Sequence, residues 1–168
     1  MAINPYVTFP LLTSVALIQG TILSRISLLG ARPNLMLLVV LIWAVVRGID
    51  EGLLWAFIGG LMLDLLSGGP LASITLAMVA AAYVAGQSLG EEVGSQAVRV
   101  MMLTVLGALA YHLVLLITLD LSGHAVDWGH ALLRVAGPSV LLNAAAAPLL
   151  LGPLTWLERA SGEEGLTL

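Results

Sequence analysis

Four long uncharged runs constrain this chain more than any other feature of its sequence. They cover residues 1–24, 65–87, 100–119 and 135–157, and each is near or above the roughly 20 residues that cross a bilayer as a helix. Only 10% of the residues are charged and 60% are apolar, whereas about 25% of an average globular protein is charged. The runs therefore predict an integral membrane protein.

Two shorter apolar stretches complete the predicted helices. Residues 33–46 would form about 21 Å of helix at roughly 1.5 Å per residue, and residues 52–66 are similar but contain Asp64. We interpret these stretches as a short antiparallel hairpin whose flanking arginines snorkel to the interface. The fold class predicted is an all-α integral membrane protein, one membrane domain over residues 1–168. It is a bundle of six transmembrane helices at about 5–24, 33–47, 50–66, 70–90, 97–120 and 131–157.

Charge and cysteine content exclude several function classes but leave the topology open. The formal net charge is −4 and there is no basic surface, so nucleic acid is not an expected partner. The chain has no cysteine, which excludes disulfides and thiolate metal sites. Six spans put both termini on one side, yet the arginines that normally mark the cytoplasm divide evenly. The two groups are Arg47, Arg99 and Arg159 against Arg25, Arg32 and Arg134.

Asp64 carries the charge that a membrane makes most expensive. An unpaired carboxylate inside a span costs about 2.5 to 3.5 kcal/mol or more, and the predicted position near the carboxyl end of a helix adds an unfavourable helix dipole. Folding the hairpin at Ile49 brings Asp64 level with Asn34 and within reach of Arg32. A structural pair between Arg32 and Asp64 is the leading interpretation. The alternative, a carboxylate that carries a proton or ion, lacks a second intramembrane acid nearby in the sequence.

Other chemistry-bearing residues form no convincing catalytic or metal site. Asp120, His124, Asp127 and His130 would share one face of a continuous helix, as metal ligands do, but Ser122 and two glycines argue against such a helix. We expect these to be solvated loop residues. The chain shows no assembled nucleophile, base and oxyanion arrangement and no phosphate-binding glycine loop, so neither enzyme activity nor a cofactor or metal is expected.

Small residues recur at helical spacing and suit close contact between membrane helices. Two interpretations stay open, internal packing of the bundle or contact with a partner helix. The candidate partner contacts are Ala77, Ala81, Ala85 and Gly86.

The stretch from residue 32 to residue 71 carries a resemblance to a known family. It reads Arg32-Pro33-Asn34-Leu35, Trp43, Arg47-Gly48, Glu51-Gly52, Phe57, Gly60-Leu61 and Asp64-Leu65-Leu66-Ser67-Gly68-Gly69-Pro70-Leu71. This pattern, with the later Asn143 and Ala147-Pro148-Leu149, resembles the rod shape-determining protein MreD. The chain departs from the family after Leu71, where glycine and histidine are common and this sequence has Ala72-Ser73-Ile74.

The resemblance implies a function and a topology. It implies a multi-pass component of the bacterial inner membrane, with both termini in the cytoplasm and no catalysis of its own. Such a protein binds the transmembrane helix of MreC and supports side-wall peptidoglycan synthesis, with the elongation synthase as an indirect partner. The family is also thought to share the fold of the substrate-binding subunits of energy-coupling-factor transporters.

That shared fold supplies an alternative function, a vitamin-capture subunit. A capture subunit needs several polar groups converging on one ligand. The predicted outward connections at 25–32 and 67–70 are short and poor in such groups.

Overall fold

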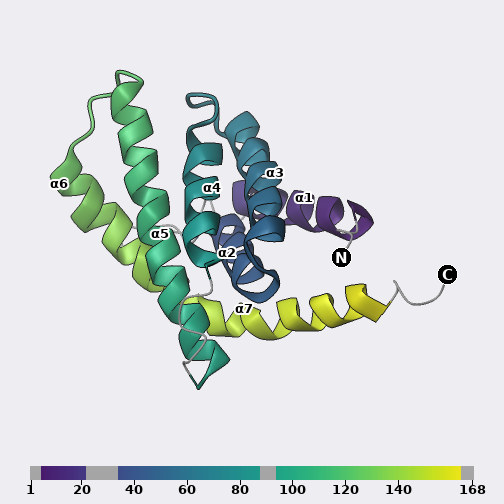
Figure 1. Cartoon of the computed structure of the whole chain (residues 1–168). Coiled ribbons are helices and arrows are strands. Elements are labelled where there is room, and N and C mark those ends of the chain that lie inside the picture. Colours follow the sequence, from purple (N-terminus) through teal and green to yellow (C-terminus); the bar gives the residue numbers. More distant parts are fainter. Residues whose placement is uncertain (1–4, 22–33, 88–93, 164–168) are drawn as a thin grey trace.

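The computed structural model describes residues 5–21, 34–87 and 94–163, and in these residues all regular secondary structure is helical (Figure 1). The elements are α1 (Pro5–Thr21), α2 (Leu35–Arg47), α3 (Ile49–Ser67), α4 (Ser73–Ala85), α5 (Gln96–Leu121), α6 (Trp128–His130), the π-helical η2 (Ala131–Ala136) and α7 (Gly137–Glu163). Because α6, η2 and α7 follow one another without a break, they correspond to the sixth predicted helix. The all-α class is confirmed, and each predicted helix has a counterpart in the described residues.

Element boundaries differ most from the prediction at the sixth and fourth helices. The sixth was expected over residues 131–157, but it runs from Trp128 to Glu163. The fourth was expected over residues 70–90, but α4 begins only at Ser73 and ends at Ala85. The chain turns at Pro70, whose carbonyl accepts a hydrogen bond from the Ser73 amide at 3.3 Å. The expected ends of the first helix, beyond Thr21, and of the fourth, at residues 88–90, lie outside the described residues.

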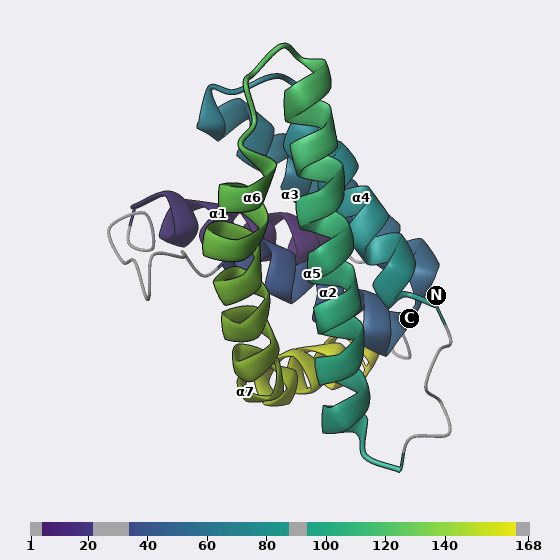
Figure 2. The ribbon, with the colours of Figure 1, turned by 90° about the vertical axis from the view of Figure 1, so that its left-hand side faces the viewer.

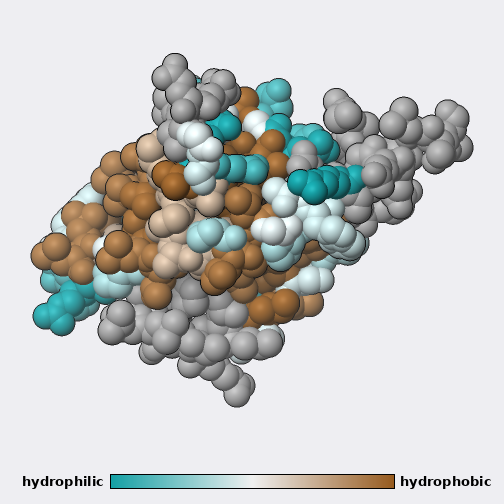
Figure 3. Space-filling view, turned by 90° about the horizontal axis from the view of Figure 1, so that it is seen from below, coloured by the Kyte–Doolittle hydropathy of each residue, from teal (hydrophilic) through white to brown (hydrophobic). Residues whose placement is uncertain are grey.

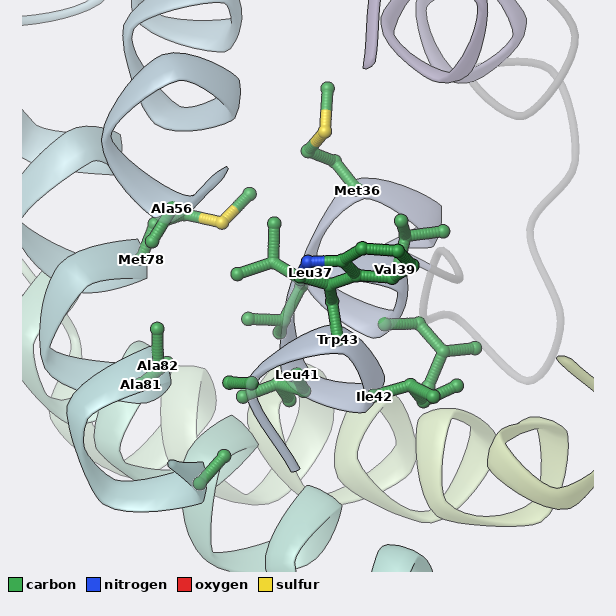
Figure 4. Close-up of a cluster of buried hydrophobic side chains, with 14 of the residues drawn as sticks. Met36, Leu37, Val39, Leu41, Ile42, Trp43, Ala56, Met78, Ala81 and Ala82 are labelled. Carbon is green, nitrogen blue, oxygen red and sulfur yellow. The ribbon is translucent and has the colours of Figure 1, made fainter. Parts of the chain in front are cut away.

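The centre of the fold is α2, which the sequence predicted as one arm of a short antiparallel hairpin. All of its residues from Met36 to Val45 are buried, and it contacts α1, α3, α4, α5 and α7. A helix that is apolar on every side is typical of a protein interior or of a membrane span. Figure 4 shows side chains of α2 pointing to all sides, with Ala56 of α3 and Met78 of α4 among their neighbours.

The remaining helices do not form a simple parallel bundle. In two perpendicular views α3, α4 and α5 run along one direction, whereas α1 and the later part of α7 run across it (Figures 1 and 2). The α3–α4 and α5–α6 connections lie at the same end of the molecule (Figure 1).

Glycines allow the close approach of helices around α2. A Cβ on Gly60 would lie 2.6 Å from the Thr75 Cα, and a Cβ on Gly86 would lie 2.7 Å from the Ile49 Cα. A Cβ on Gly52 would overlap Ala44. At these positions α2 packs closely on α3, and α3 packs closely on the α4 region. The neighbouring atoms belong to the backbone or to a short alanine side chain, so they cannot move aside for an added Cβ.

The outer faces of the helices are apolar. Two helical segments in the described residues are long and apolar enough to cross a membrane, Gln96–Leu121 and Trp128–Leu157. Exposed large apolar side chains recur along α3 and α5, and hydrophobic residues cover much of the face in Figure 3. On α3 they are Leu54, Phe57, Leu61, Leu65 and Leu66, and on α5 they include Leu106, Leu109, Leu113 and Ile117. Lipid chains can cover such a surface without the cost that water would impose.

Candidate functional site at the polar centre of the bundle

Asp64 is a buried cap on the start of α4. Its side chain is 2% exposed, and its two oxygens accept hydrogen bonds from the Ile74 amide at 2.9 Å and the Thr75 amide at 2.9 Å. The Thr75 hydroxyl donates a further hydrogen bond to the same carboxylate. The positive end of a helix dipole favours an anion, so α4 offsets much of the cost of burying this charge. Asp64 thereby ties the last turn of α3 to the first turn of α4.

This position corrects the electrostatic argument made from the sequence. Asp64 does lie near the unfavourable carboxyl end of α3, but the 67–72 turn brings the favourable amino end of α4 against it. Thr75 is the residue that sequence reasoning missed. The available signal was a Ser67-Gly68-Gly69-Pro70 turn that separates an acid from a following helix. Arg32 and Pro33 lie outside the described residues, so the Arg32–Asp64 pair stays a prediction.

Three further polar side chains meet near Asp64 and bring α2, α5 and α7 together. Asn34 caps α2 by accepting from the Leu37 amide at 3.0 Å, and its own amide donates to Asn143 Oδ1 of α7 at 3.4 Å. Tyr111 of α5 is buried, and its side chain interacts with Asn34 and with Asp64. We call Asn34, Asp64, Tyr111 and Asn143 the polar centre. The sequence predicted that Asn34 lies level with Asp64, and Tyr111 interacts with both residues.

The polar centre is built to hold helices together. It contains one carboxylate, whose oxygens already accept hydrogen bonds from α4, and it contains no second acid to pass a proton onward. Asn143 is 1% exposed, and its Nδ2 has no hydrogen-bond partner in the part of the chain that the structure describes. Among those residues, no group of His, Cys, Asp and Glu side chains is arranged to hold a metal ion.

The residues considered as metal ligands do not share one helix. α5 ends at Leu121 and α6 begins at Trp128, so the continuous helix that would align Asp120 with His130 is interrupted. Asp127 is instead a helix cap, because its Oδ1 accepts a hydrogen bond from the His130 amide at 3.1 Å.

A comparison with protein-family models identifies the family of this chain. The model of the rod shape-determining protein MreD family matches residues 1–160. The chain belongs to the MreD family. With its two long apolar helices, this membership makes it a membrane protein with a role in rod shape determination. No curated protein and no solved structure matched the chain.

Several residues of the motif that suggested the MreD family have structural roles. Asn34 caps α2, Gly52 and Gly60 allow close helix contact, and Asp64 caps α4. Gly68 ends α3 with a φ of 66°, a left-handed conformation that glycine adopts without strain.

Arg47 belongs to a second polar group of the MreD motif, at the α2–α3 turn. Its Nε lies 3.2 Å from Glu51 Oε2, and the same oxygen accepts a hydrogen bond from Trp43 Nε1 at 3.2 Å. Trp43 also stacks on Trp55 of α3, with ring centroids 4.1 Å apart and planes 11° apart. The Glu51 carboxylate therefore links α3 to α2 at the start of α3, whereas Asp64 lies near the other end of α3.

Ala72 lies where this chain departs from the MreD family pattern. Its φ is 69°, and among the residues that the structure describes no other residue except glycine has a positive φ. The Cβ of Ala72 therefore lies in a left-handed backbone conformation that is strained for residues other than glycine.

The small residues considered as partner contacts lie inside the MreD fold. Ala77, Ala81 and Ala85 are all 0% exposed, and Gly86 packs against the start of α3. Their helical spacing serves packing of α4 against its neighbours α3, α2 and α5. These three alanines are therefore not accessible to a helix from another protein.

Proposed function

We propose that this protein is a non-catalytic membrane scaffold of the bacterial cell-elongation machinery that binds the transmembrane helix of MreC. The observation that carries the proposal is the match of the MreD family over residues 1–160. In this role the scaffold supports side-wall peptidoglycan synthesis and contacts the elongation synthase indirectly. The polar centre is consistent with it, because its hydrogen bonds connect the protein's own helices.

The apolar outer faces are the surfaces on which a partner helix would pack. In a bilayer, helices associate by van der Waals packing and interhelical hydrogen bonds, because lipid chains are as apolar as leucine. The exposed stripes on α3 and α5 each run for several turns, as a contact with a single transmembrane helix requires.

Site-specific photo-crosslinking tests the partner. A photoreactive phenylalanine analogue is introduced at Phe57 and Leu61 on α3 and at Leu106 and Leu113 on α5, with the buried Ala81 as the matched control. We expect crosslinks to MreC from one of the two helices and none from Ala81. Absence of MreC crosslinks at all four exposed sites, with the protein correctly inserted, would contradict binding through these faces.

The proposed topology has six spans and both termini in the cytoplasm of the bacterial inner membrane. Ser67 and Ser122 are exposed and lie in or beside connections at one end of the molecule. Because the natural chain has no cysteine, a single cysteine introduced at either position is the sole thiol that can react with the reagent. We expect both to react with an impermeant thiol reagent added outside, and a cysteine at the exposed Asp50 to react only after lysis. The reverse pattern would invert the topology.

Shape and ligand assays separate the scaffold from the alternative of a vitamin-capture subunit. We expect deletion to round a rod-shaped host without loss of vitamin uptake. The protein purified in mild detergent should retain MreC and no vitamin. Normal rods after complete deletion, or a tightly retained vitamin, would favour the capture subunit. The expected likeness to energy-coupling-factor subunits stays a prediction.

A further inference from the structure

The sixth helical segment is longer than a membrane span requires. Its apolar part, Trp128–Leu157, has 30 residues, or about 45 Å of helix at roughly 1.5 Å per residue. The hydrocarbon core of a bilayer is about 30 Å thick, and an average tilt near 20° lengthens the path by only about 2 Å. A straight span would therefore carry about ten apolar residues, and the rest of α7 to Glu163, out of the hydrocarbon.

The segment does not continue straight. In both views it first runs alongside α5 and then turns, so that the later part of α7 lies across the direction of α5 (Figures 1 and 2). The turned part lies towards the end of the molecule at which α5 begins (Figure 1). α7 contains Pro148 and Pro153, and a proline inside a helix removes a backbone hydrogen bond and permits a bend.

The turned part has two different faces. One face packs on the core through the buried Ala147 and Leu154, with Leu150 and Leu151 partly buried beside them. Ala147 and Leu154 lie two helical turns apart on one side of α7, and both pack against the core. This contact fixes the direction of the helix relative to the bundle.

The opposite face is exposed and has the composition of a membrane interface. Leu149 is 78% exposed and Trp156 is 71% exposed, and Gly152 is exposed between them. Arg159 is exposed one turn beyond Trp156. Tryptophan and arginine near the end of an apolar helix are typical of the headgroup level, where the indole ring is half-solvated and the guanidinium reaches phosphates.

We propose that residues 147–163 lie along the phospholipid interface instead of completing the span, with Leu149 and Trp156 facing the lipid. The span then ends where α7 turns, and the turned part anchors the carboxyl-terminal region on the membrane surface. Lipid is the occupant that suits this face, because the helix runs across the spans, its outer side is apolar, and its end carries interfacial residues.

Depth measurement by electron paramagnetic resonance tests this arrangement in the full chain. Nitroxide labels are attached to single cysteines at Leu149, Gly152 or Trp156, and the protein is reconstituted in phosphatidylethanolamine–phosphatidylglycerol vesicles. Power saturation with oxygen and a water-soluble nickel complex then gives the depth of each label. The matched control is the pair Leu106 and Leu113 on α5, which are exposed and have the same sequence separation as Leu149 and Trp156.

The two pairs should behave differently. We expect the depths at positions 149 and 156 to agree within about 3 Å and to lie near the phosphates, whereas positions 106 and 113 should differ by about 10 Å, the rise of seven helical residues. The Gly152 variant keeps Trp156 and should give the same depth. A difference of about 10 Å between positions 149 and 156 would show a continuing span and overturn the proposal. Full accessibility of all three labels to the nickel complex would overturn it as well.

Discussion

Replacing Asp64 tests the central structural claim, that this carboxylate caps α4 and ties it to α3. Asp64→Ala removes all acceptors of the Ile74 and Thr75 amides, which lie 2.9 Å from the carboxylate oxygens. Losing a helix cap costs about 1 kcal/mol, and leaving a buried amide unsatisfied costs about 1 to 3 kcal/mol more. We therefore expect the free energy of unfolding to fall by about 2 to 4 kcal/mol.

Graded variants separate the cap from other roles of the charge. Asp64→Asn keeps one acceptor oxygen and loses the favourable interaction with the α4 dipole, so a loss of about 1 to 2 kcal/mol is expected. The control is Asp50→Ala, an exposed acid in the first turn of α3, which should cost less than about 1 kcal/mol. The measurement is unfolding by sodium dodecyl sulfate in mixed micelles, followed by circular dichroism.

A double-mutant cycle identifies the partner of Asp64. Combining Asp64→Asn with Thr75→Val should show a coupling of about 0.5 to 3 kcal/mol, because the Thr75 hydroxyl donates to the carboxylate. The same cycle with Arg32→Ala tests the pair predicted from sequence. A stability of Asp64→Ala within about 0.5 kcal/mol of the natural protein would refute the capping argument, and strict additivity with Thr75→Val would refute this contact.

The same unfolding assay checks two further predictions. Gly60→Ala should lower stability by about 1 to 3 kcal/mol, because its Cβ would lie 2.6 Å from the Thr75 Cα and the helices must separate. Gly20→Ala, where nothing lies within 4 Å, is the matched control and should not destabilise; equal losses at the two sites would contradict the packing argument. Ala72→Gly should raise stability by up to about 1 kcal/mol, because relief of the left-handed conformation, about 1 to 2 kcal/mol, exceeds the entropy that glycine adds to the unfolded chain, about 0.4 to 1 kcal/mol. A lower stability would mean that the 69° φ at this position is not strained.

The helix ends were predicted most accurately where an apolar run stops at an arginine or a glycine. α2 was expected over residues 33–47 and α3 over residues 50–66, and they occupy Leu35–Arg47 and Ile49–Ser67. Arginine and glycine mark these ends because charge avoids the apolar interior and glycine permits a turn. The prediction of the fourth helix was less accurate. The amino end of α4 depends on Asp64, which accepts a hydrogen bond from the Ile74 amide and lies ten residues earlier in the chain.

Spacing alone did not reveal which faces are internal. The Ala77, Ala81 and Ala85 stripe suited either a foreign helix or a neighbour in the same chain, because close packing needs the same small residues in both cases. The structure buries all three completely. Likewise, the apolar residues of α2 are compatible with a lipid-facing hairpin arm until five other helices are placed around it.

The sequence by itself determined the membrane class, the helical content and the presence of a turn at each end of α3, because local hydrophobicity and backbone preference suffice for these. Tertiary structure alone decided that α2 is central, that Asp64 meets the start of α4, and that α7 turns across the bundle. These features join residues distant in the chain. Their energies depend on which helix ends and faces approach one another, and a one-dimensional pattern of apolar and polar residues does not contain that distance information.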